Sequence, residues 1–311
     1  MAGPTFDSEV RELAGRAIAR MRARLVRFAP GLAVDADDWM KGLSRTGEAH
    51  DYFTGGRSIL LLLPRFLAEI CAPAPDQTFE FDLAYSTISA YYFVRLIDDV
   101  VDSAPAARPL LLPLLGFLHA EFQSTYTRYF PPDSNFWDRF QYDWFKMAEA
   151  AVEQTRLPEV SSDDFLRLSA AKSGGVKIPL AAVCRFYGRP DLIQGWCDFF
   201  DGFAAWSQMQ DDVFDWSRDS AQGCTTYFLS EARRRKRLDE SVSSWVVREG
   251  LEWGYSRTVN QMHAARAVAA QLGSDRLVRF IDYRETQVAQ VWKRLSPQLP
   301  ALAKLALVFG G

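Results

Sequence analysis

Two groups of aspartates are the residues of this sequence best suited to chemistry. They share one spacing: Asp98, Asp99 and Asp102 form the first group, and Asp211, Asp212 and Asp215 form the second. In a helix this spacing places the first and last aspartate of a group on one face, about 6 Å apart, where like charges destabilise the helix. Because the neighbouring residues in the sequence are mostly apolar, we expect a cation to compensate each group.

The chemistry of these side chains indicates which cation. Carboxylate oxygens are hard ligands, and the 3 His and 4 Cys residues show neither C-x-x-C nor H-x-x-x-H spacing. The sequence therefore predicts that all six aspartates bind Mg²⁺, with Mn²⁺ as the other candidate. Mg²⁺ usually completes its coordination with water and substrate phosphates, so we expect a diphosphate substrate. The other interpretation is two solvent-exposed helix turns without a metal.

The helix faces that lead back from the aspartates indicate what the diphosphate carries. Behind Asp98 the expected face contains Val94, Tyr91, Thr87 and Ala84, and behind Asp211 and Asp215 it contains Gln208, Ser207, Ala204 and Phe200. A largely apolar tunnel below a charged mouth fits a prenyl chain, and aromatic rings can stabilise a carbocation. Alternatively, Tyr91 and Phe200 are ordinary core residues of a helical bundle.

Helical periodicity dominates the sequence, so the expected fold class is all-α. Helices are expected over 7–28, 35–46, 54–72, 78–103, 109–129, 134–156, 162–187, 190–218, 224–236, 239–270 and 274–296, with Pro30 among the proline stops. Neither a linker nor an internal repeat divides the chain. We therefore expect one domain over residues 1–311, a single large helical bundle.

The stretch SQMQDDVFDWSRDSAQG, in which Gln208 precedes the aspartates, resembles the second aspartate-rich region of the trans-polyprenyl diphosphate synthases, a family of class I isoprenoid synthases. Asp98, Asp99 and Asp102 match the first region of that family, and Lys172 with Ser173 matches its Lys-Thr pair. The resemblance covers roughly residues 50–230. It implies an isoprenoid synthase-like bundle around a central cavity, a catalytic role for Lys172 and the six aspartates, and a homodimer.

Three departures from the family pattern concern the site for isopentenyl diphosphate. The family has Gly-Gly-Lys-x-x-Arg-Pro; here Arg57 follows Gly55-Gly56 in place of the lysine, and the family's arginine is lost. Only Arg108 represents the family's double arginine, and Cys224 replaces a lysine. Arg57 and Arg108 remain candidate substrate-binding residues. A second diphosphate needs several fixed cations, so the resemblance implies a degenerate acceptor site.

Three functions follow from these observations. The first is a terpene synthase that ionises an allylic prenyl diphosphate and cyclises or quenches the carbocation, and the second is a prenyltransferase with isopentenyl diphosphate or an unusual acceptor. The third, a non-catalytic subunit, is disfavoured by the complete aspartate groups. A net charge of −3 with mixed signs argues against nucleic acid. The apolar stretches are too short to span a membrane, so we expect a cytoplasmic protein.

Tyr91 lies two helical turns before Asp98, about 10 Å along the axis, where roughly two prenyl units would end. We expect Tyr91→Ala to shift preference toward longer prenyl diphosphates, or to change the product mixture, because the enlarged cavity changes how the chain folds before ionisation. Product analysis by gas chromatography checks this. Unchanged products from a folded variant would make Tyr91 a core residue only.

Overall fold

The structure, a computed structural model, describes residues 6–101 and 111–299. Within these ranges it is all-helical and contains no strand, which confirms the expected all-α class. The α-helices are α1 (Phe6–Phe28), α2 (Pro30–Gly42), α3 (Ile59–Cys71), α4 (Gln77–Val101), α5 (Leu112–Tyr126), α6 (Phe136–Arg156), α7 (Ser162–Lys172), α8 (Gly174–Phe186), α9 (Ile193–Phe214), α10 (Trp216–Ala221), α11 (Tyr227–Arg235), α12 (Val242–Trp245), α13 (Leu251–Gln271) and α14 (Asp275–Leu295).

Short 3₁₀ turns and one π-helical turn complete the described elements. They are η1 (Ala49–Phe53), η2 (Gly55–Arg57), η4 (Pro190–Leu192), the π-helical η5 (Val246–Gly250) and η6 (Ser296–Gln298). None of the helices in the described ranges has the length and apolar character needed to cross a membrane.

The helices expected over 35–46 and 54–72 begin five residues away from their expected starts. Pro30 was expected to stop a helix, but it is the first residue of α2, where its fixed φ suits a helix and its missing N–H costs nothing. In the range expected as a helix over 54–72, Gly55 adopts φ +65° and the 3₁₀ turn η2 comes first, so that the α-helix begins only at Ile59.

The helix expected over 162–187 is interrupted at Ser173, so that α7 ends at Lys172 and α8 begins at Gly174. Close packing explains the glycine after the break: a Cβ atom on Gly174 would lie 2.3 Å from the backbone oxygen of Asp143 in α6. At its other end, α7 begins with a capping box in which Ser161 and Asp164 bond each other's backbone N–H. Lys172 is thus held at the end of a short helix with two defined termini.

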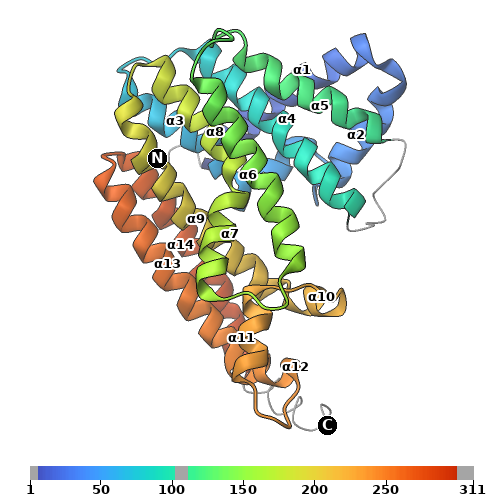
Figure 1. The fold of residues 1–311 in the computed structure, drawn as a ribbon, viewed down its shortest axis with the longest axis vertical. Helices are drawn as coiled ribbons and strands as arrows, with labels where there is room; N and C mark the ends of the chain where they lie inside the picture. The colour runs from blue at the N-terminus through green and yellow to red at the C-terminus, as the bar shows by residue number, and fades with distance from the viewer. Residues whose placement is uncertain (1–5, 102–110, 300–311) are drawn as a thin grey trace. The chain divides into compact units, whose positions relative to one another are not determined.

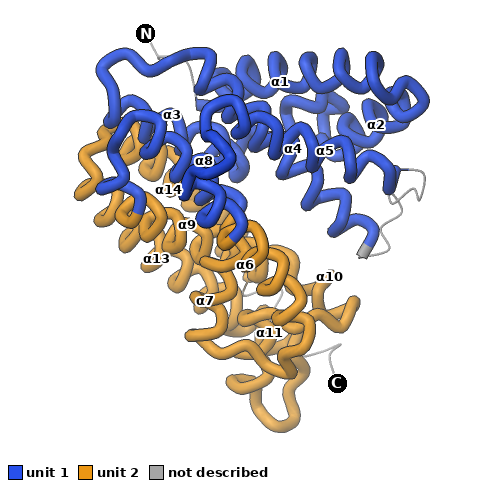
Figure 2. The backbone as a smooth tube through the Cα atoms, turned by 45° about the horizontal axis from the view of Figure 1, so that its top comes forward, with its two compact units in different colours: residues 1–141, 175–193 blue, residues 142–174, 194–311 orange. Residues whose placement is uncertain are grey.

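The chain folds into two compact units, coloured in Figure 2. Unit 1 comprises residues 1–141 and 175–193, and unit 2 comprises residues 142–174 and 194–311. The first aspartate group belongs to unit 1, whereas Lys172 and the second group belong to unit 2. The single domain expected over 1–311 stays a prediction, as do the isoprenoid synthase-like fold and its central cavity.

Unit 1 is organised around α4, which runs beside α5 and also packs on α1 (Figure 1). The buried carboxylate of Asp82 in α4 pairs with Arg20 at 2.5 Å and Arg128 at 2.9 Å, and it accepts a hydrogen bond from Tyr129. Such pairing offsets the cost of removing the charge from water. These contacts fix the first half of α4, the helix whose last turns carry Asp98 and Asp99.

Glu121 of α5 gives unit 1 a second buried anchor. Its carboxylate pairs with Arg24 of α1 at 2.5 Å and accepts a hydrogen bond from Tyr85 of α4 at 2.6 Å. One acid thus holds three helices together.

Unit 2 is organised around α9, whose buried residues pack against α11 and α13. Met209 and Val213 of α9 belong to a core cluster with Phe228 of α11 and Trp245. A Cβ atom on Gly254 of α13 would lie 2.5 Å from Val213, so glycine permits α13 to approach α9 closely. This core fixes the end of α9, where the second aspartate group lies.

We expect Gly174→Ala to lower the free energy of unfolding by about 1–3 kcal/mol, because its methyl group would overlap the Asp143 backbone oxygen. Gly116→Ala is the matched control, since a Cβ atom there meets nothing within 4 Å inside α5. Alanine at that site should stabilise the helix by roughly 0.5–1 kcal/mol. Chemical denaturation of both variants checks this, and equal stabilities would refute the close-approach argument.

Candidate functional site

Asp212 is the buried carboxylate of the second aspartate group. Its side chain is 3% exposed, and it accepts hydrogen bonds from the Gln208 side chain at 2.8 Å and from the backbone N–H of Phe228. Burial raises the pKa of Asp212 to about 6, from an ordinary 3.8, and these two hydrogen bonds oppose the rise only in part. Lys172 lies close enough to act on Asp212 electrostatically and also favours its charged form.

Lys172, Gln208 and Asp212 line one small cavity together with Ser169 of α7, and the cavity volume is about 10 Å³, enough for one water molecule. The Ser169 hydroxyl is buried and has no hydrogen-bond partner among the described residues. Sequence reasoning missed Ser169. Its position one helical turn before Lys172 was the only available signal.

The other two aspartates of the second group have different surroundings. Asp211 is exposed, whereas Asp215 is partly buried and forms an ion pair with Arg218 at 2.7 Å. Helix α9 ends at Phe214, and the backbone N–H of Asp215 bonds the Asp211 carbonyl at 2.8 Å. Asp215 therefore lies one residue beyond the helix on whose face it was expected.

In the first group, the two described aspartates also differ. Asp98 is exposed near the end of α4. Asp99 is 1% exposed, pairs with Arg95 at 2.6 Å and accepts a hydrogen bond from Trp39 at 3.0 Å. Asp99 thus already has a cationic partner within unit 1. Asp102 lies outside the described residues, as does Arg108.

Arg57 meets the expected substrate face of α4 at Tyr91. Its Nε donates a hydrogen bond to the Tyr91 hydroxyl at 3.1 Å, and its guanidinium lies 4.3 Å from the ring centre of Tyr52. Tyr91 also packs on Tyr52 and Phe53, with ring centres 5.9 and 5.8 Å apart. The structure therefore places Arg57 against Tyr91, which lies on α4, the helix that also carries Asp98.

Further back on the same face, Thr87 and Ala84 line a cavity of about 270 Å³ between α1, α3 and α4. Its wall is partly apolar, but Glu9 and Arg65 also line it and form an ion pair. Val94 is partly buried on α4. Thr87 and Ala84 thus border a cavity with charged as well as apolar walls.

The predicted substrate residues of α9 lie in or near the core of unit 2. Phe200 is 4% exposed and stacks on Phe203 with ring centres 6.1 Å apart, and Ala204 is partly buried. Gln208 bonds Asp212, so its orientation is fixed toward the second aspartate group. Of these residues, Gln208 alone lines the cavity that contains Lys172.

The carboxylate of Asp212 accepts hydrogen bonds from uncharged groups, whereas several other buried acids pair with arginines. In unit 1, Asp82, Asp99 and Glu121 each pair with an arginine, and in unit 2 Glu231 pairs with Arg234 and Arg235. Asp212 is held instead by an amide and a backbone N–H. A strongly shifted carboxyl that shares a cavity with a lysine is typical of a functional site.

The donors in the two aspartate groups are carboxylate oxygens, a ligand type that Mg²⁺ accepts. In the part of the chain that the structure describes, no three Asp, Glu, His or Cys side chains gather into a complete metal site. Mg²⁺ commonly uses one or two carboxylates and takes its other ligands from water and phosphates. Asp98 in unit 1 and Asp211 in unit 2 are both exposed.

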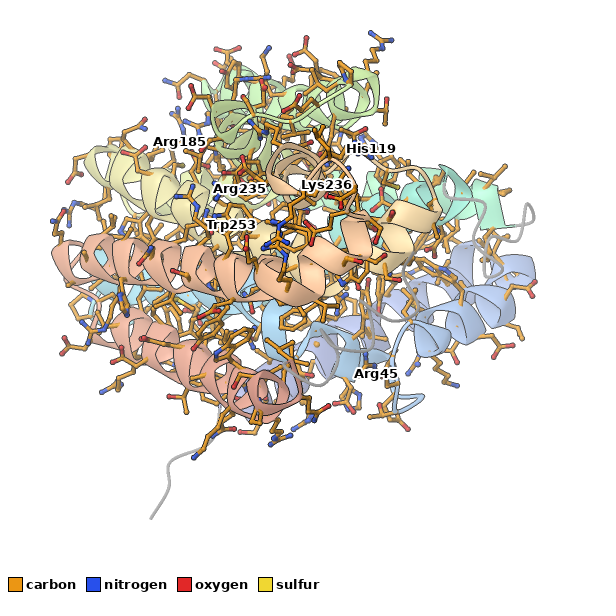
Figure 3. All side chains as sticks on the ribbon, turned by 90° about the horizontal axis from the view of Figure 1, so that it is seen from below. Arg45, His119, Arg185, Arg235, Lys236 and Trp253 are labelled. Carbon is orange, nitrogen blue, oxygen red and sulfur yellow. The ribbon has the colours of Figure 1, made fainter. Side chains whose placement is uncertain are left out.

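A basic run, Arg233–Arg237, comprises the last turn of α11 and the two residues after it. Arg235 lies over the ring of Trp253 at 4.8 Å, and both side chains are labelled in Figure 3. Arg235 also pairs with Glu231. Arg234 pairs with Glu159 and Glu231. Two of these arginines therefore already have acidic partners.

No protein-family model matches the chain, and its sequence matches no curated protein significantly. The resemblance to the trans-polyprenyl diphosphate synthases therefore stays a prediction from the motifs.

In metal-free protein, ionisation of Asp212 should destabilise the fold. The neutral form of Asp212 does not have this cost. Because the pKa of Asp212 is about 6 in the folded protein and ordinarily 3.8, the stability gained from the neutral form is complete below pH 3.8 and is lost between about pH 4 and 6. We expect Asp212→Asn to be more stable than the natural protein above pH 6, by up to about 3 kcal/mol. The exposed Asp211→Asn should change stability by less than about 0.5 kcal/mol. Denaturation in chelator at several pH values checks this, and parallel pH profiles for all three proteins would contradict it.

Proposed function

We propose that the protein is a Mg²⁺-dependent class I terpene synthase. It ionises an allylic prenyl diphosphate, cyclises or quenches the carbocation and releases diphosphate. The observation that carries this proposal is the shared cavity of Lys172, Gln208 and Asp212. Helix α7 and helix α9 bring these residues together, although Lys172 lies far from the other two in the sequence. The motif resemblance assigns the same three residues to one active site.

The residues have distinct roles in this proposal. Asp98 and Asp211, which are exposed, would each supply a carboxylate oxygen to Mg²⁺. The metal, when bound, would supply positive charge to the leaving diphosphate, which carries about three negative charges. Lys172 adds a fixed positive charge, and Gln208 orients Asp212. The apolar residues of α4 and α9 exclude water from the prenyl chain.

A prenyltransferase is the second candidate, and the position of Arg57 favours it. Arg57 contacts Tyr91 on the helix that carries Asp98, so one cation remains where an acceptor diphosphate would be held. In that reaction the allylic group is transferred to isopentenyl diphosphate or another acceptor. The proposed homodimer applies to both candidates.

One incubation distinguishes these functions. Purified protein is supplied with Mg²⁺ and with allylic diphosphates of ten, fifteen or twenty carbons, with and without isopentenyl diphosphate. A hydrocarbon or alcohol formed without isopentenyl diphosphate supports the terpene synthase, whereas longer diphosphates support the transferase. A protein that turns over none of these substrates would contradict the proposal and favour a non-catalytic subunit.

We expect Asp98→Ala and Asp211→Ala each to lower turnover at least about a hundredfold, and chelator to abolish it, because neither group alone neutralises the leaving diphosphate. Both aspartates are exposed, so the variants should stay folded, as circular dichroism can verify. Asp35→Ala and Asp239→Ala, which remove aspartates outside the two groups, are the matched controls and should retain activity. Full turnover in excess chelator would refute the metal requirement.

Lys172→Ala should lower turnover or raise KM for the allylic diphosphate, since the substrate loses a fixed cation. Lys177→Ala is the comparison, because Lys177 is also partly buried but belongs to unit 1 and does not line the cavity of Asp212. Steady-state kinetics at several substrate concentrations separate the two effects. Normal kinetics in Lys172→Ala, with a defect in Lys177→Ala, would assign the diphosphate contact to Lys177.

A further inference from the structure

The connection between α11 and α12 in unit 2 presents an apolar side chain to solvent. Leu238 is fully exposed, more so than any other large apolar side chain that the structure describes. The backbone N–H of Glu240 donates a hydrogen bond to the Arg237 carbonyl at 3.1 Å, which closes a turn over residues 237–240. Leu238 is therefore the second residue of a closed turn and lies at its tip.

Side-chain contacts hold this turn in place. The Glu240 carboxylate accepts two hydrogen bonds from the Arg248 guanidinium, both at 2.7 Å, and a third from the backbone N–H of Arg237 at 3.0 Å. Directly after the turn, Ser241 caps the first turn of α12. Withdrawing Leu238 from solvent would therefore break several hydrogen bonds, so its exposure is a fixed property of the turn.

Three cations near the tip have no acid of their own. Arg233 and Lys236 form no ion pair with any residue that the structure describes. Arg237 is exposed, and the acid that closes the turn, Glu240, is already paired with Arg248. The Lys236 ammonium, labelled in Figure 3, donates a hydrogen bond to the Arg237 carbonyl at 3.4 Å. Its positive charge therefore lies at the first residue of the turn.

Positive charge beside an exposed leucine is complementary to the surface of an anionic lipid bilayer. Anionic headgroups attract lysine and arginine, and an apolar side chain loses contact with water when it enters the boundary between headgroups and acyl chains. A nucleic acid would also attract the cations, but its phosphates give Leu238 no apolar contact. Asp239, the next residue, is exposed and would be repelled by the same headgroups, so it weakens such binding.

We propose that residues 233–238 form a docking site for anionic lipid bilayers, at which Arg233, Lys236 and Arg237 contact the headgroups and Leu238 enters the interface. Because the turn is already closed in the structure, docking costs little ordering of the backbone. Three cations and one leucine give peripheral and reversible binding. The proposal is independent of the proposed function, since none of these residues lines the cavity that contains Asp212.

The test uses the full chain and sedimentation with lipid vesicles. We expect the protein to bind vesicles of phosphatidylcholine that contain about one third phosphatidylserine, and to bind pure phosphatidylcholine at least about tenfold more weakly. Raising the salt concentration from about 0.1 M to about 0.5 M should release the protein, because salt screens the headgroup charge. Equal binding to both kinds of vesicle, or none to the anionic vesicles, would overturn the proposal.

Three variants test the roles of the residues. Leu238→Ser should lower the vesicle partition coefficient about tenfold, and Lys236→Gln should lower it about fivefold. Asp239→Asn should instead raise it about fivefold, since it removes a repelled charge. All three side chains lie at the surface, so the variants should stay folded, as circular dichroism can verify. Weaker binding in Asp239→Asn would contradict the proposed contact.

Leu166→Ser and Arg279→Gln are the matched controls, because they remove an exposed leucine and an exposed arginine elsewhere in unit 2. Both should bind vesicles like the natural protein, and a loss equal to that of Leu238→Ser and Lys236→Gln would show that the turn is not the site. Fluorescence anisotropy with a labelled DNA duplex tests the other partner. Tight DNA binding, together with vesicle binding that Leu238→Ser leaves unchanged, would assign the cations to nucleic acid and overturn the proposal.

Discussion

The cost of removing a carboxylate from water shapes both units of this protein. Ion pairs with arginines offset this cost for Asp82 and Glu121, and these ion pairs connect the first half of α4 to α1 and α5. For Asp212 an amide and a backbone N–H offset this cost only in part, so the pKa of Asp212 is raised and its proton is held more tightly than in water. The same physical penalty therefore builds the framework of unit 1 and raises the pKa of Asp212 in unit 2.

The second aspartate group shows how one short motif produces different environments. Asp211 faces solvent and Asp212 faces the core, because adjacent residues of a helix point in different directions. Asp215 follows the end of α9 and turns toward Arg218. The buried member is suited to orient and tune the site, and the exposed member is suited to bind a ligand. The motif contains aspartate at all three positions, so it does not indicate which aspartate is buried and which is exposed.

The sequence predicted the helical class and most helices, since their apolar periodicity follows directly from burial of one face. It did not predict the start of α2 at Pro30 or the break at Ser173. The first depends on local backbone geometry, and the second coincides with the contact of Gly174 with α6. The sequence pattern also indicated Lys172, Gln208 and Asp212 as candidate site residues, but it did not indicate how deeply they are buried, and it did not indicate Ser169.

The division into units has a consequence for how the chain can fold as it is synthesised. Unit 1 lacks residues 175–193 until after the first segment of unit 2 has been made. The pairing of Asp82 and Glu121 with α1 can form early, because all its partners precede residue 130. Helix α8, in contrast, must return to a partly formed unit after residues 142–174 have emerged. No single cut of the chain separates the two units, so a truncation at any one position removes part of at least one of them.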